Sequence, residues 1–410
     1  MPNAQLVAMM RHGIAHANAN SMELVDEVLR VPASNYTSPD RFKLEVDRIF
    51  KRLPLMLAPS CEIPEPNDYK TLEVAGVPLL LLRDAQGQVR LYVNSCTHRG
   101  TNVATEPTGS ARRFVCPYHG WTFGQGGELL AVAAAGDFGE VDKSCLGLTA
   151  LPVAERAGLV FGTLDTKASV DFDAYLGGYD ELLEIFGFRS WHFFASRVLK
   201  GPNWKIAYDG YLDFYHLPVL HKNTLNANGA FTTRAHYHAW GPHQRLLAPD
   251  RSAKAQADVP EAEWTDEQLL SGVWTIFPSI SIASFNGGGR GVLISQLLPG
   301  DAVGESWTRQ IYLMERKPTA EEEAAAHAQF AFLETVVKDE DYATGLRQQR
   351  ALDHGTLKTV LFGRNEGGAQ TFHQWTDRLI AADDQELAAI WPRLLDRDAG
   401  QLAAARQAAE

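Results

Sequence analysis

The spacing of apolar residues divides the chain into three parts, and the first has a helical pattern. In SPDRFKLEVDRIFKRLP at 38–54, Ser38 is a candidate N-cap and Pro39 suits a first helical turn. The apolar positions that follow recur near the helical period, and they are Phe42, Val46, Ile49 and Phe50. We therefore expect residues 1–55 to form a mostly helical segment.

The second part, residues 56–165, has the pattern of short strands. YKTLEVAGVPLLLLRDAQGQVRLYVNSC at 69–96 contains strand-like runs separated by a hairpin turn at DAQGQ. GQGGE at 124–128 predicts another turn, and GLVFGTL at 158–164 predicts another strand. This part is expected to be a small all-β domain.

The third part, residues 166–410, mixes both periods, so the fold class expected for the chain is α+β. FDAYLGGYDELLEIFG at 172–187 predicts one amphipathic helix, and 319–352 predicts a long helical stretch interrupted near Gly345. VWTIFPSISIASF, GVLISQLLPG and SWTRQIYLMER predict strands of an antiparallel sheet.

Length and charge narrow the function classes. A chain of 410 residues is long enough for two domains, and its net charge of −12 without a Lys/Arg run argues against nucleic-acid binding. The strongest apolar run, at 77–82, is too short to span a membrane. Because Arg11, His12 and His16 interrupt the N-terminal region, no signal peptide is expected, and we expect a cytoplasmic protein.

Four cysteines are present, and two of them stand beside histidines. Cys61 and Cys145 have no such neighbours and are expected to be buried thiols without disulfides. Cys96 and His98 form one pair, and Cys116 and His119 form a second pair after seventeen intervening residues. Each pair is followed by a glycine, which permits a tight loop.

Two thiolates and two imidazoles make four metal ligands. Zinc accepts this set, but zinc fingers group Cys with Cys and His with His. One Cys and one His from each loop suit a Rieske [2Fe–2S] cluster, in which two Cys hold one iron and two His hold the other. Structural zinc stays open as an alternative. A Rieske cluster alone relays electrons, so a second site is expected to receive them.

NWKIAYDGYLDFYHLPVLH at 203–221 offers that second site. His216 and His221 are five residues apart, so an ideal helix would place them on different faces, about 140° apart. Pro218 lies between them and disturbs a helix. We predict an irregular helix whose break or π-type widening lets both imidazoles converge on one ion.

Two His and one carboxylate form the facial triad of non-haem Fe(II) oxygenases. KDEDYATGLRQQ at 338–349 provides Asp339, Glu340 and Asp341 as candidates for the third ligand. Sequence spacing alone does not decide among these acids.

Taken in order, these motifs resemble the α subunit of Rieske non-haem iron ring-hydroxylating oxygenases. The resemblance implies a catalytic domain at 166–410 with a curved antiparallel sheet covered by helices, of the helix-grip, START-like kind. It implies iron ligation by His216, His221 and Asp341, because the family pattern of Glu-Asp, an aromatic residue and a later Gln is matched here by Glu340, Asp341, Tyr342 and Gln349. Gly210 and the LRQQ segment depart from the family pattern.

The resemblance also gives Asp213 a role. In the family, an acid at this position connects the Rieske histidine of one subunit to the iron histidine of the next. Here the acid would join His119 to His216 of a neighbouring chain, which implies a ring of at least three subunits, either a homotrimer (α3) or α3β3 with a small β subunit.

The activity implied is that of a terminal oxygenase component. It takes electrons from NAD(P)H through a reductase or ferredoxin, uses O2, and cis-dihydroxylates an apolar, aromatic substrate. Monooxygenation or O-/N-demethylation is the alternative, and an electron-transfer Rieske protein without oxygenase activity is a third. Candidate pocket residues are Phe214, Leu217, Leu220, Ile282, Phe285, Leu293 and Phe362, and Arg290 and Arg309 are candidates to hold a substrate carboxylate.

Overall fold

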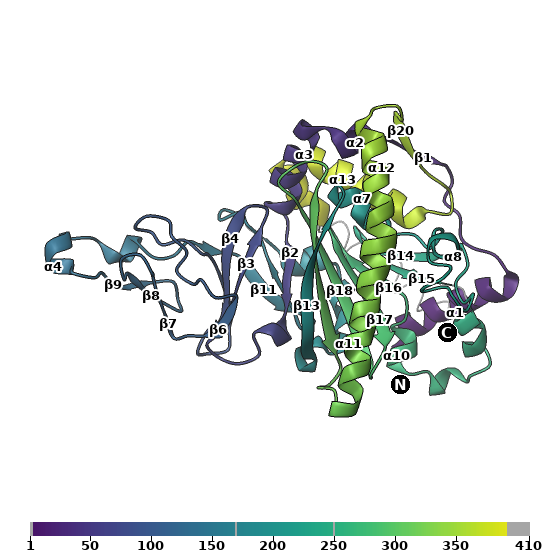
Figure 1. Ribbon diagram of the computed structural model, residues 1–410, viewed down its shortest axis with the longest axis horizontal. Helices are drawn as coiled ribbons and strands as arrows, with labels where there is room; N and C mark the ends of the chain where they lie inside the picture. Colours follow the sequence, from purple (N-terminus) through teal and green to yellow (C-terminus); the bar gives the residue numbers. More distant parts are fainter. Residues whose placement is uncertain (1–2, 169, 249–250, 392–410) are drawn as a thin grey trace. The chain divides into compact units, whose positions relative to one another are not determined.

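The computed structural model describes residues 3–168, 170–248 and 251–391. Two compact units divide the chain: the first comprises residues 1–49, 173–186 and 191–410, and the second comprises 50–172 and 187–190. The predicted α+β class is confirmed, because the second unit is built of β-strands and the first combines a large antiparallel sheet with helices (Figure 1).

The β unit contains three small antiparallel sheets, ordered β10-β5-β4-β3-β6, β11-β12-β2 and β7-β8-β9. The predicted hairpin at DAQGQ is present, with Gly87 at φ +81° between β4 and β5. The strands are β2 (Leu55–Pro59), β3 (Asp68–Val74), β4 (Val77–Arg83), β5 (Val89–Val93), β6 (Thr108–Ser110), β7 (Arg113–Val115), β8 (Thr122–Gly124), β9 (Leu129–Ala131), β10 (Ala150–Leu151), β11 (Val153–Arg156) and β12 (Leu159–Gly162), and α4 (Ala135–Phe138) is a short helix.

The first unit is organised around a seven-stranded antiparallel sheet ordered β13-β19-β18-β17-β16-β15-β14. The predicted strands are all present, although the segment 273–285 divides into two. The members are β13 (His192–Gly201), β14 (His236–Trp240), β15 (His243–Leu247), β16 (Val273–Ile276), β17 (Ile280–Asn286), β18 (Arg290–Pro299) and β19 (Ser306–Met314).

The two faces of this sheet differ, because neighbouring residues on a strand point to opposite sides. On one face, six polar residues on six adjacent strands pair with one another in a row, which we call the polar row. They are Arg197, Gln310, Ser295, Ser281, Thr275 and Gln244. The opposite face carries Arg245, Trp274, Ile282, Ile294 and Arg309. Helix α11 packs on the polar-row face, where Leu333 and Ala326 meet Tyr312 and Leu293.

Helices and one small sheet complete the first unit. They are α1 (Ala4–Ala19), α2 (Ser34–Thr37), α3 (Pro39–Glu45), the π-helix η1 (Val46–Phe50), α5 (Phe172–Leu176), α6 (Tyr179–Leu183), α7 (Trp204–Asp209), α8 (Leu217–Leu220), α9 (Arg251–Gln256), α10 (Asp266–Leu269), α11 (Ala320–Thr335), the π-helix η7 (Val336–Tyr342), α12 (Ala343–Asp353) and α13 (Gly367–Ala381). Strands β1 (Leu29–Pro32) and β20 (Thr359–Phe362) pair with each other.

Several sequence-based expectations were wrong in detail. The single helix expected at 172–187 is broken by Gly177 and Gly178, both at positive φ, into α5 and α6. The interruption expected near Gly345 lies earlier, in η7, and Gly345 itself is helical. The N-terminal segment contains β1 as well as helices, and Cys145 is exposed, whereas Cys61 is buried as expected. The predicted cap is confirmed, because Ser38 Oγ accepts the N–H of Arg41.

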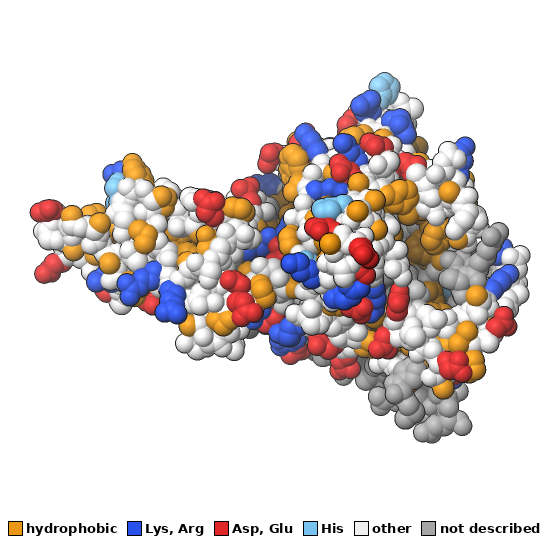
Figure 2. All heavy atoms as spheres, turned by 60° about the horizontal axis from the view of Figure 1, so that its bottom comes forward, with side chains coloured by type: hydrophobic (Ala, Val, Ile, Leu, Met, Phe, Trp, Pro, Cys, Tyr) orange, Lys and Arg blue, Asp and Glu red, His pale blue; other side chains and the backbone are white. Residues whose placement is uncertain are grey.

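Among the helices that the structure describes, none has the length and hydrophobicity required to cross a bilayer. On the face shown in Figure 2, Lys and Arg side chains lie interspersed with Asp and Glu side chains. This distribution agrees with the acidic net charge and offers no wide basic surface on that face.

Candidate metal centres

The first candidate ligand pair lies on the loop that follows β5. The backbone closes this loop on itself: the N–H of Cys96 donates to the carbonyl of Thr101 over 2.8 Å, and the N–H of Gly100 donates to the carbonyl of Cys96 over 2.8 Å. Gly100 adopts φ +83°, a conformation that an L side chain would strain. His98 stands between these anchored positions.

The second pair lies on the turn between β7 and β8, and it repeats the same hydrogen bonds. The N–H of Cys116 donates to the carbonyl of Trp121 over 2.8 Å, and the N–H of Gly120 donates to the carbonyl of Cys116 over 3.0 Å. Gly120 adopts φ +69°. The two loops therefore present Cys and His in equivalent ways, one pair from each.

The side chains of both loops converge. The imidazole rings of His98 and His119 have centroids 4.7 Å apart, and the Nδ1 atom of each is buried without a hydrogen-bond partner. Burial raises the pKa of the Cys96 thiol, and the neighbouring Cys116 raises it further. Two unpartnered imidazole nitrogens beside two adjacent thiols are the groups that a metal cluster would use.

The separation of these ligand atoms argues against one ion. A single zinc with bonds of 2.0–2.3 Å would hold its four ligand atoms within about 4 Å of one another. Among the described residues, two groups of three or more have ligand atoms within 4.8 Å of one another, and these four residues form neither group. The residues present thus fit a two-iron cluster better than structural zinc.

A buried asparagine that the sequence analysis missed supports the first loop. Asn94 is 1% exposed, its Oδ1 accepts the N–H groups of Val103 and Ala104, and its Nδ2 donates to the carbonyl of Ala104. The only indication of this role in the sequence is that Asn94 stands two residues before Cys96. The ring of His98 also stacks on Trp121, with an interplanar angle of 9°.

The second centre is formed by a broken helix, as predicted. Helix α8 has four residues, with His216 immediately before it and His221 immediately after it, and Pro218 lies in its first turn. The short helix turns the chain so that the two imidazoles approach each other, with ring centroids 5.0 Å apart at 70°. The five-residue spacing is therefore compatible with one shared ion.

The third group comes from the π-helix η7, more than a hundred residues later. Asp341 Oδ1 lies 3.1 Å from His221 Nε2 and 3.7 Å from His216 Nε2. One ligand atom from each of these three residues lies within 4.8 Å of the others. Asp339 is exposed on the same π-helix and is not part of this group, so the geometry favours Asp341 among the candidate acids.

Each histidine also has its own carboxylate on the other ring nitrogen. Asp213 Oδ1 accepts from His216 Nδ1 over 2.9 Å, and Glu340 Oε2 lies 2.6 Å from His221 Nδ1 and accepts from Thr224 Oγ1. These contacts direct both Nε2 atoms toward Asp341. Orientation of ligand histidines by such carboxylates is common in metal sites.

The carboxylates also set the protonation of the histidines. Burial alone would lower the pKa of His216, but the hydrogen bond and charge of Asp213 outweigh it and raise that pKa. For His221 burial is likewise outweighed, chiefly by Asp341 and then by Glu340, so its pKa is also raised. Protons and a cation compete for the same Nε2 atoms. The sequence pattern Glu-Asp at 340–341 included Glu340 but did not predict its contact with His221.

Further polar side chains lie near this centre, on the face of the sheet that carries the polar row. Tyr211 is half-buried with a buried hydroxyl oxygen, and burial raises the pKa of this hydroxyl to about 12, although the nearby side chains of Ser295, Tyr342 and Gln310 act to lower it. Gln310 Oε1 accepts from Arg197 Nε over 2.7 Å, and Arg197 also stacks over Phe330 at 3.7 Å. Arg197 Nη2 and Gln310 Nε2 are buried without hydrogen-bond partners.

The predicted pocket residues fall into three groups. Phe214 and Leu217 form one buried cluster, and Leu293 and Phe285 belong to the cluster beneath α11. Ile282, Arg290 and Arg309 lie on the opposite face of the sheet, so they were wrong as pocket candidates on this side; Arg290 pairs with Glu315 over 2.7 Å. The N–H of Leu220, in α8, donates to the carbonyl of His216 over 2.8 Å, whereas the ring of Phe362 on β20 lies 4.7 Å from that of His373.

Models of two known families match two different segments of the chain, one around each candidate metal centre. A model of the Rieske [2Fe-2S] domain matches residues 54–143. A model of the ring hydroxylating alpha subunit (catalytic domain) matches residues 188–382. These two segments contain all of the candidate ligands described above.

Relatives with known activities are of two kinds. The large subunit of anthranilate 1,2-dioxygenase from Acinetobacter baylyi is 32% identical over 209 residues, which cover 49% of this chain and 44% of that protein. Choline monooxygenase of Amaranthus tricolor is 36% identical over 198 residues, which cover 47% and 44%. The matches thus span a little under half of these relatives' own length.

Among solved structures, naphthalene 1,2-dioxygenase from Rhodococcus sp. superimposes with a TM-score of 0.72 at 22% identity, covering 94% of this chain and 100% of that one. At this identity the likeness concerns the fold. The two matched domains, in this order and with these side chains, place the chain among the Rieske non-haem iron ring-hydroxylating oxygenase α subunits.

Proposed function

We propose that this chain is the terminal oxygenase component of a multicomponent system that hydroxylates a small organic substrate with O2. The observation that carries the proposal is the convergence of His216, His221 and Asp341 on one point, in a chain that also has paired Cys–His loops. Two His and one carboxylate on one side of an ion leave positions free for O2 and substrate. A protein that only relayed electrons would not need this second site.

The roles of the side chains follow from their contacts. When bound, the Rieske cluster supplies single electrons and the mononuclear iron supplies activation of O2. Asp213 and Glu340 hold His216 and His221, respectively, because each carboxylate accepts a hydrogen bond from the Nδ1–H of its histidine. Asp341 provides the negative charge that offsets part of the charge of a divalent ion.

Electron delivery is the part of the proposal that needs other chains. Electrons would come from NAD(P)H through a reductase, a ferredoxin or both, in the cytoplasm. Asp213, which already holds His216, would receive His119 of a neighbouring copy, so that the working assembly is a homotrimer (α3) or α3β3. Support comes from the family, whose members work with reductases as oligomers, and from the contact between Asp213 and His216.

For the substrate we favour an aromatic ring that carries a hydrogen-bond acceptor such as a carboxylate. Arg197 and Gln310 have buried N–H groups without partners on the polar-row face, and Leu293 with Phe285 offers apolar surface on that same face. Unpaired buried donors are costly and become satisfied when a ligand supplies an acceptor. cis-Dihydroxylation is the favoured reaction. Monooxygenation or demethylation is the second candidate, favoured by the similarity to choline monooxygenase.

Iron analysis and oxygen uptake test the proposal. We expect three irons per chain and O2 uptake that depends on substrate. Two irons and no substrate-dependent uptake would instead identify an electron-transfer protein. Products formed under ¹⁸O2 from aromatic acids, polycyclic hydrocarbons and N-methyl compounds then separate the reactions: two labelled oxygens indicate a dihydrodiol, and one indicates monooxygenation.

The assignment of Arg197 is tested by Arg197→Met. For an aromatic acid we expect KM to rise roughly 10–100-fold, the usual effect of losing one hydrogen bond to a charged group, with a smaller change for the same ring without its carboxylate. Arg197→Lys should recover part of the loss. Lys200→Met is the control, because Lys200 lies on the same strand but is exposed and pairs with Glu305. Equal effects of Arg197→Met on both substrates would remove Arg197 from substrate binding.

A further inference from the structure

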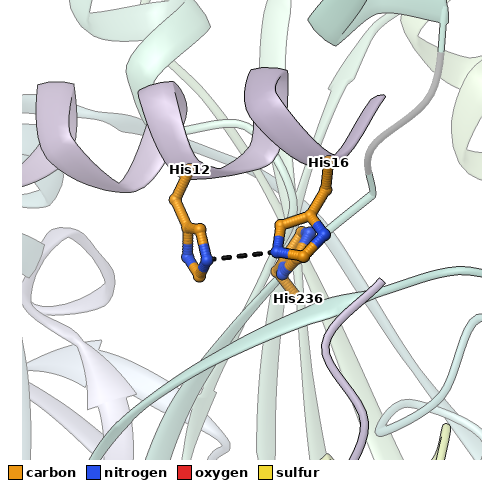
Figure 3. A group of neighbouring side chains, drawn as sticks. All are labelled: His12, His16 and His236. Carbon is orange, nitrogen blue, oxygen red and sulfur yellow. Dashed lines mark hydrogen bonds between the residues drawn. The ribbon is translucent and has the colours of Figure 1, made fainter. Parts of the chain in front are cut away.

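Three histidines outside the candidate iron site meet between helix α1 and strand β14. His12 and His16 are four residues apart on α1 and so project from one face of the helix. Their Nε2 atoms are 3.2 Å apart, and the ring of His236 on β14 has its centroid 4.0 Å from that of His16 and 4.8 Å from that of His12 (Figure 3). One ligand nitrogen from each lies within 4.8 Å of the others.

The buried member of this group has unsatisfied nitrogens. His236 is 0% exposed, and neither its Nδ1 nor its Nε2 has a hydrogen-bond partner. Burial lowers its pKa to about 3, with His16 and His12 as further causes, so the ring is neutral. A buried neutral imidazole with two open nitrogens is costly unless something occupies one of them. Neutral imidazole is also the form that binds metal ions.

Two further groups border the site. Glu23 Oε2 lies 4.0 Å from His236 Nδ1, too far for a hydrogen bond but close enough to supply a fourth ligand or to hold the ring nitrogen not used by an ion. The ring of His238 has its centroid 5.8 Å from that of His12, and its buried Nε2 has no partner either. His16 Nδ1 contacts Ser21 Oγ over 3.0 Å, which leaves its Nε2 for the site.

This group is separate from the centre formed by His216, His221 and Asp341. His236 and Tyr237 are adjacent on β14 and therefore point to opposite faces of the sheet. Tyr237 packs against the cluster of Phe214 and Leu217, next to the iron-site histidines, whereas His236 faces α1. The three histidines thus lie on the side of the sheet away from the candidate iron ligands.

We propose that His12, His16 and His236 bind a divalent transition-metal ion of the zinc type, which pins helix α1 to the edge strand of the sheet. Zinc with nitrogen ligands at 2.0–2.1 Å in tetrahedral geometry sets the ligand nitrogens about 3.3 Å apart, close to the 3.2 Å between His12 and His16. Histidines at i and i+4 on a helix, with a third ligand from a neighbouring element, are a recurrent zinc-binding arrangement. A direct imidazole–imidazole hydrogen bond is the competing explanation of the short contact.

Zinc titration of the iron-loaded protein tests the site. Wild-type protein, incubated with Zn²⁺ and desalted, should retain one more zinc per chain than His16→Gln or His12→Gln at the same iron content. Zinc should also raise the Tm of the wild type by roughly 2–4 °C or more, and this shift should be lost in both variants. His354→Gln is the control, because His354 is exposed on another element and contacts Thr356.

Two comparisons make the result decisive. His221→Ala, which disables the candidate iron site, should still take up the additional zinc, so occupancy of the iron site by zinc is distinguished from occupancy of the new site. If His16→Gln does not fold, His12→Gln carries the comparison alone, because His12 is a surface residue of the same helix. Equal zinc content and equal Tm shifts in wild type and His12→Gln would overturn the proposal and leave the imidazole hydrogen bond as the explanation.

Discussion

The two candidate metal centres of this chain are supported in different ways. At the cluster loops, main-chain hydrogen bonds close each loop, from Cys96 to Thr101 and from Cys116 to Trp121. At the mononuclear site, two segments more than a hundred residues apart meet, and side-chain carboxylates hold the histidines. A centre supported by backbone tolerates changes in nearby side chains, whereas a centre supported by carboxylates is expected to depend on each of them.

The largest expected effect is that of Asp341→Ala. It removes the carboxylate that lies between the two Nε2 atoms, so we expect iron to fall from three to two per chain and product formation to fall at least about 1000-fold. The visible spectrum of the cluster should not change, because the cluster ligands lie in the other unit. Iron content, the spectrum and product yield measure this. Asp339→Asn, an exposed acid on the same π-helix, is the control, and full iron content in Asp341→Ala would refute the assignment.

Asp213→Asn separates ligand support from electron transfer. Asparagine can still accept from His216 Nδ1, so iron should stay near three per chain. If Asp213 also connects neighbouring copies, product formation should fall at least about 100-fold, with the cluster still reducible by dithionite. Single-turnover reoxidation of the reduced cluster with substrate and O2 is the measurement. A reoxidation rate near that of the wild type would exclude the connecting role.

Glu340→Gln changes the carboxylate that holds His221, and we expect a smaller effect than that of Asp213→Asn. The carboxylate accepts from both His221 and Thr224, and an amide retains the acceptor but loses the charge. Iron affinity at the mononuclear site should fall roughly 10–100-fold, the usual range for such supporting groups. Iron retained after graded chelation with EDTA measures it, again against Asp339→Asn. Unchanged retention would mean that the charge of Glu340 does not support the site.

The same contrast explains what the sequence could predict. The two Cys–His pairs could be recognised in the sequence, because loops closed by local hydrogen bonds keep Cys and His at a fixed spacing. The meeting of His216, His221 and Asp341 needed the family pattern to choose among three adjacent acids, since η7 widens the helix and so decides which carboxylate points inward. Arg197 was not among the predicted side chains, whereas Arg290 and Arg309 were and lie on the opposite face of the sheet. The sequence does not show whether the odd-numbered or the even-numbered residues of a strand face the site. The contact of Glu340 with His221 likewise joins residues that are far apart in the sequence.

The smallest expected effect belongs to the backbone-supported centre. Gly120 follows His119 at φ +69°, and a Cβ there would meet only Ala133 Cβ at 3.4 Å, so Gly120→Ala introduces backbone strain with little steric conflict. That strain costs about 1–2 kcal/mol, which should lower the Tm of the cluster unit by a few degrees while the cluster spectrum is retained. Gly136→Ala, which has open space and no positive φ, is the matched control and should be neutral. Loss of the cluster spectrum in Gly120→Ala would show that the closed loop does not make this centre tolerant of local changes, and it would remove the contrast between the two centres.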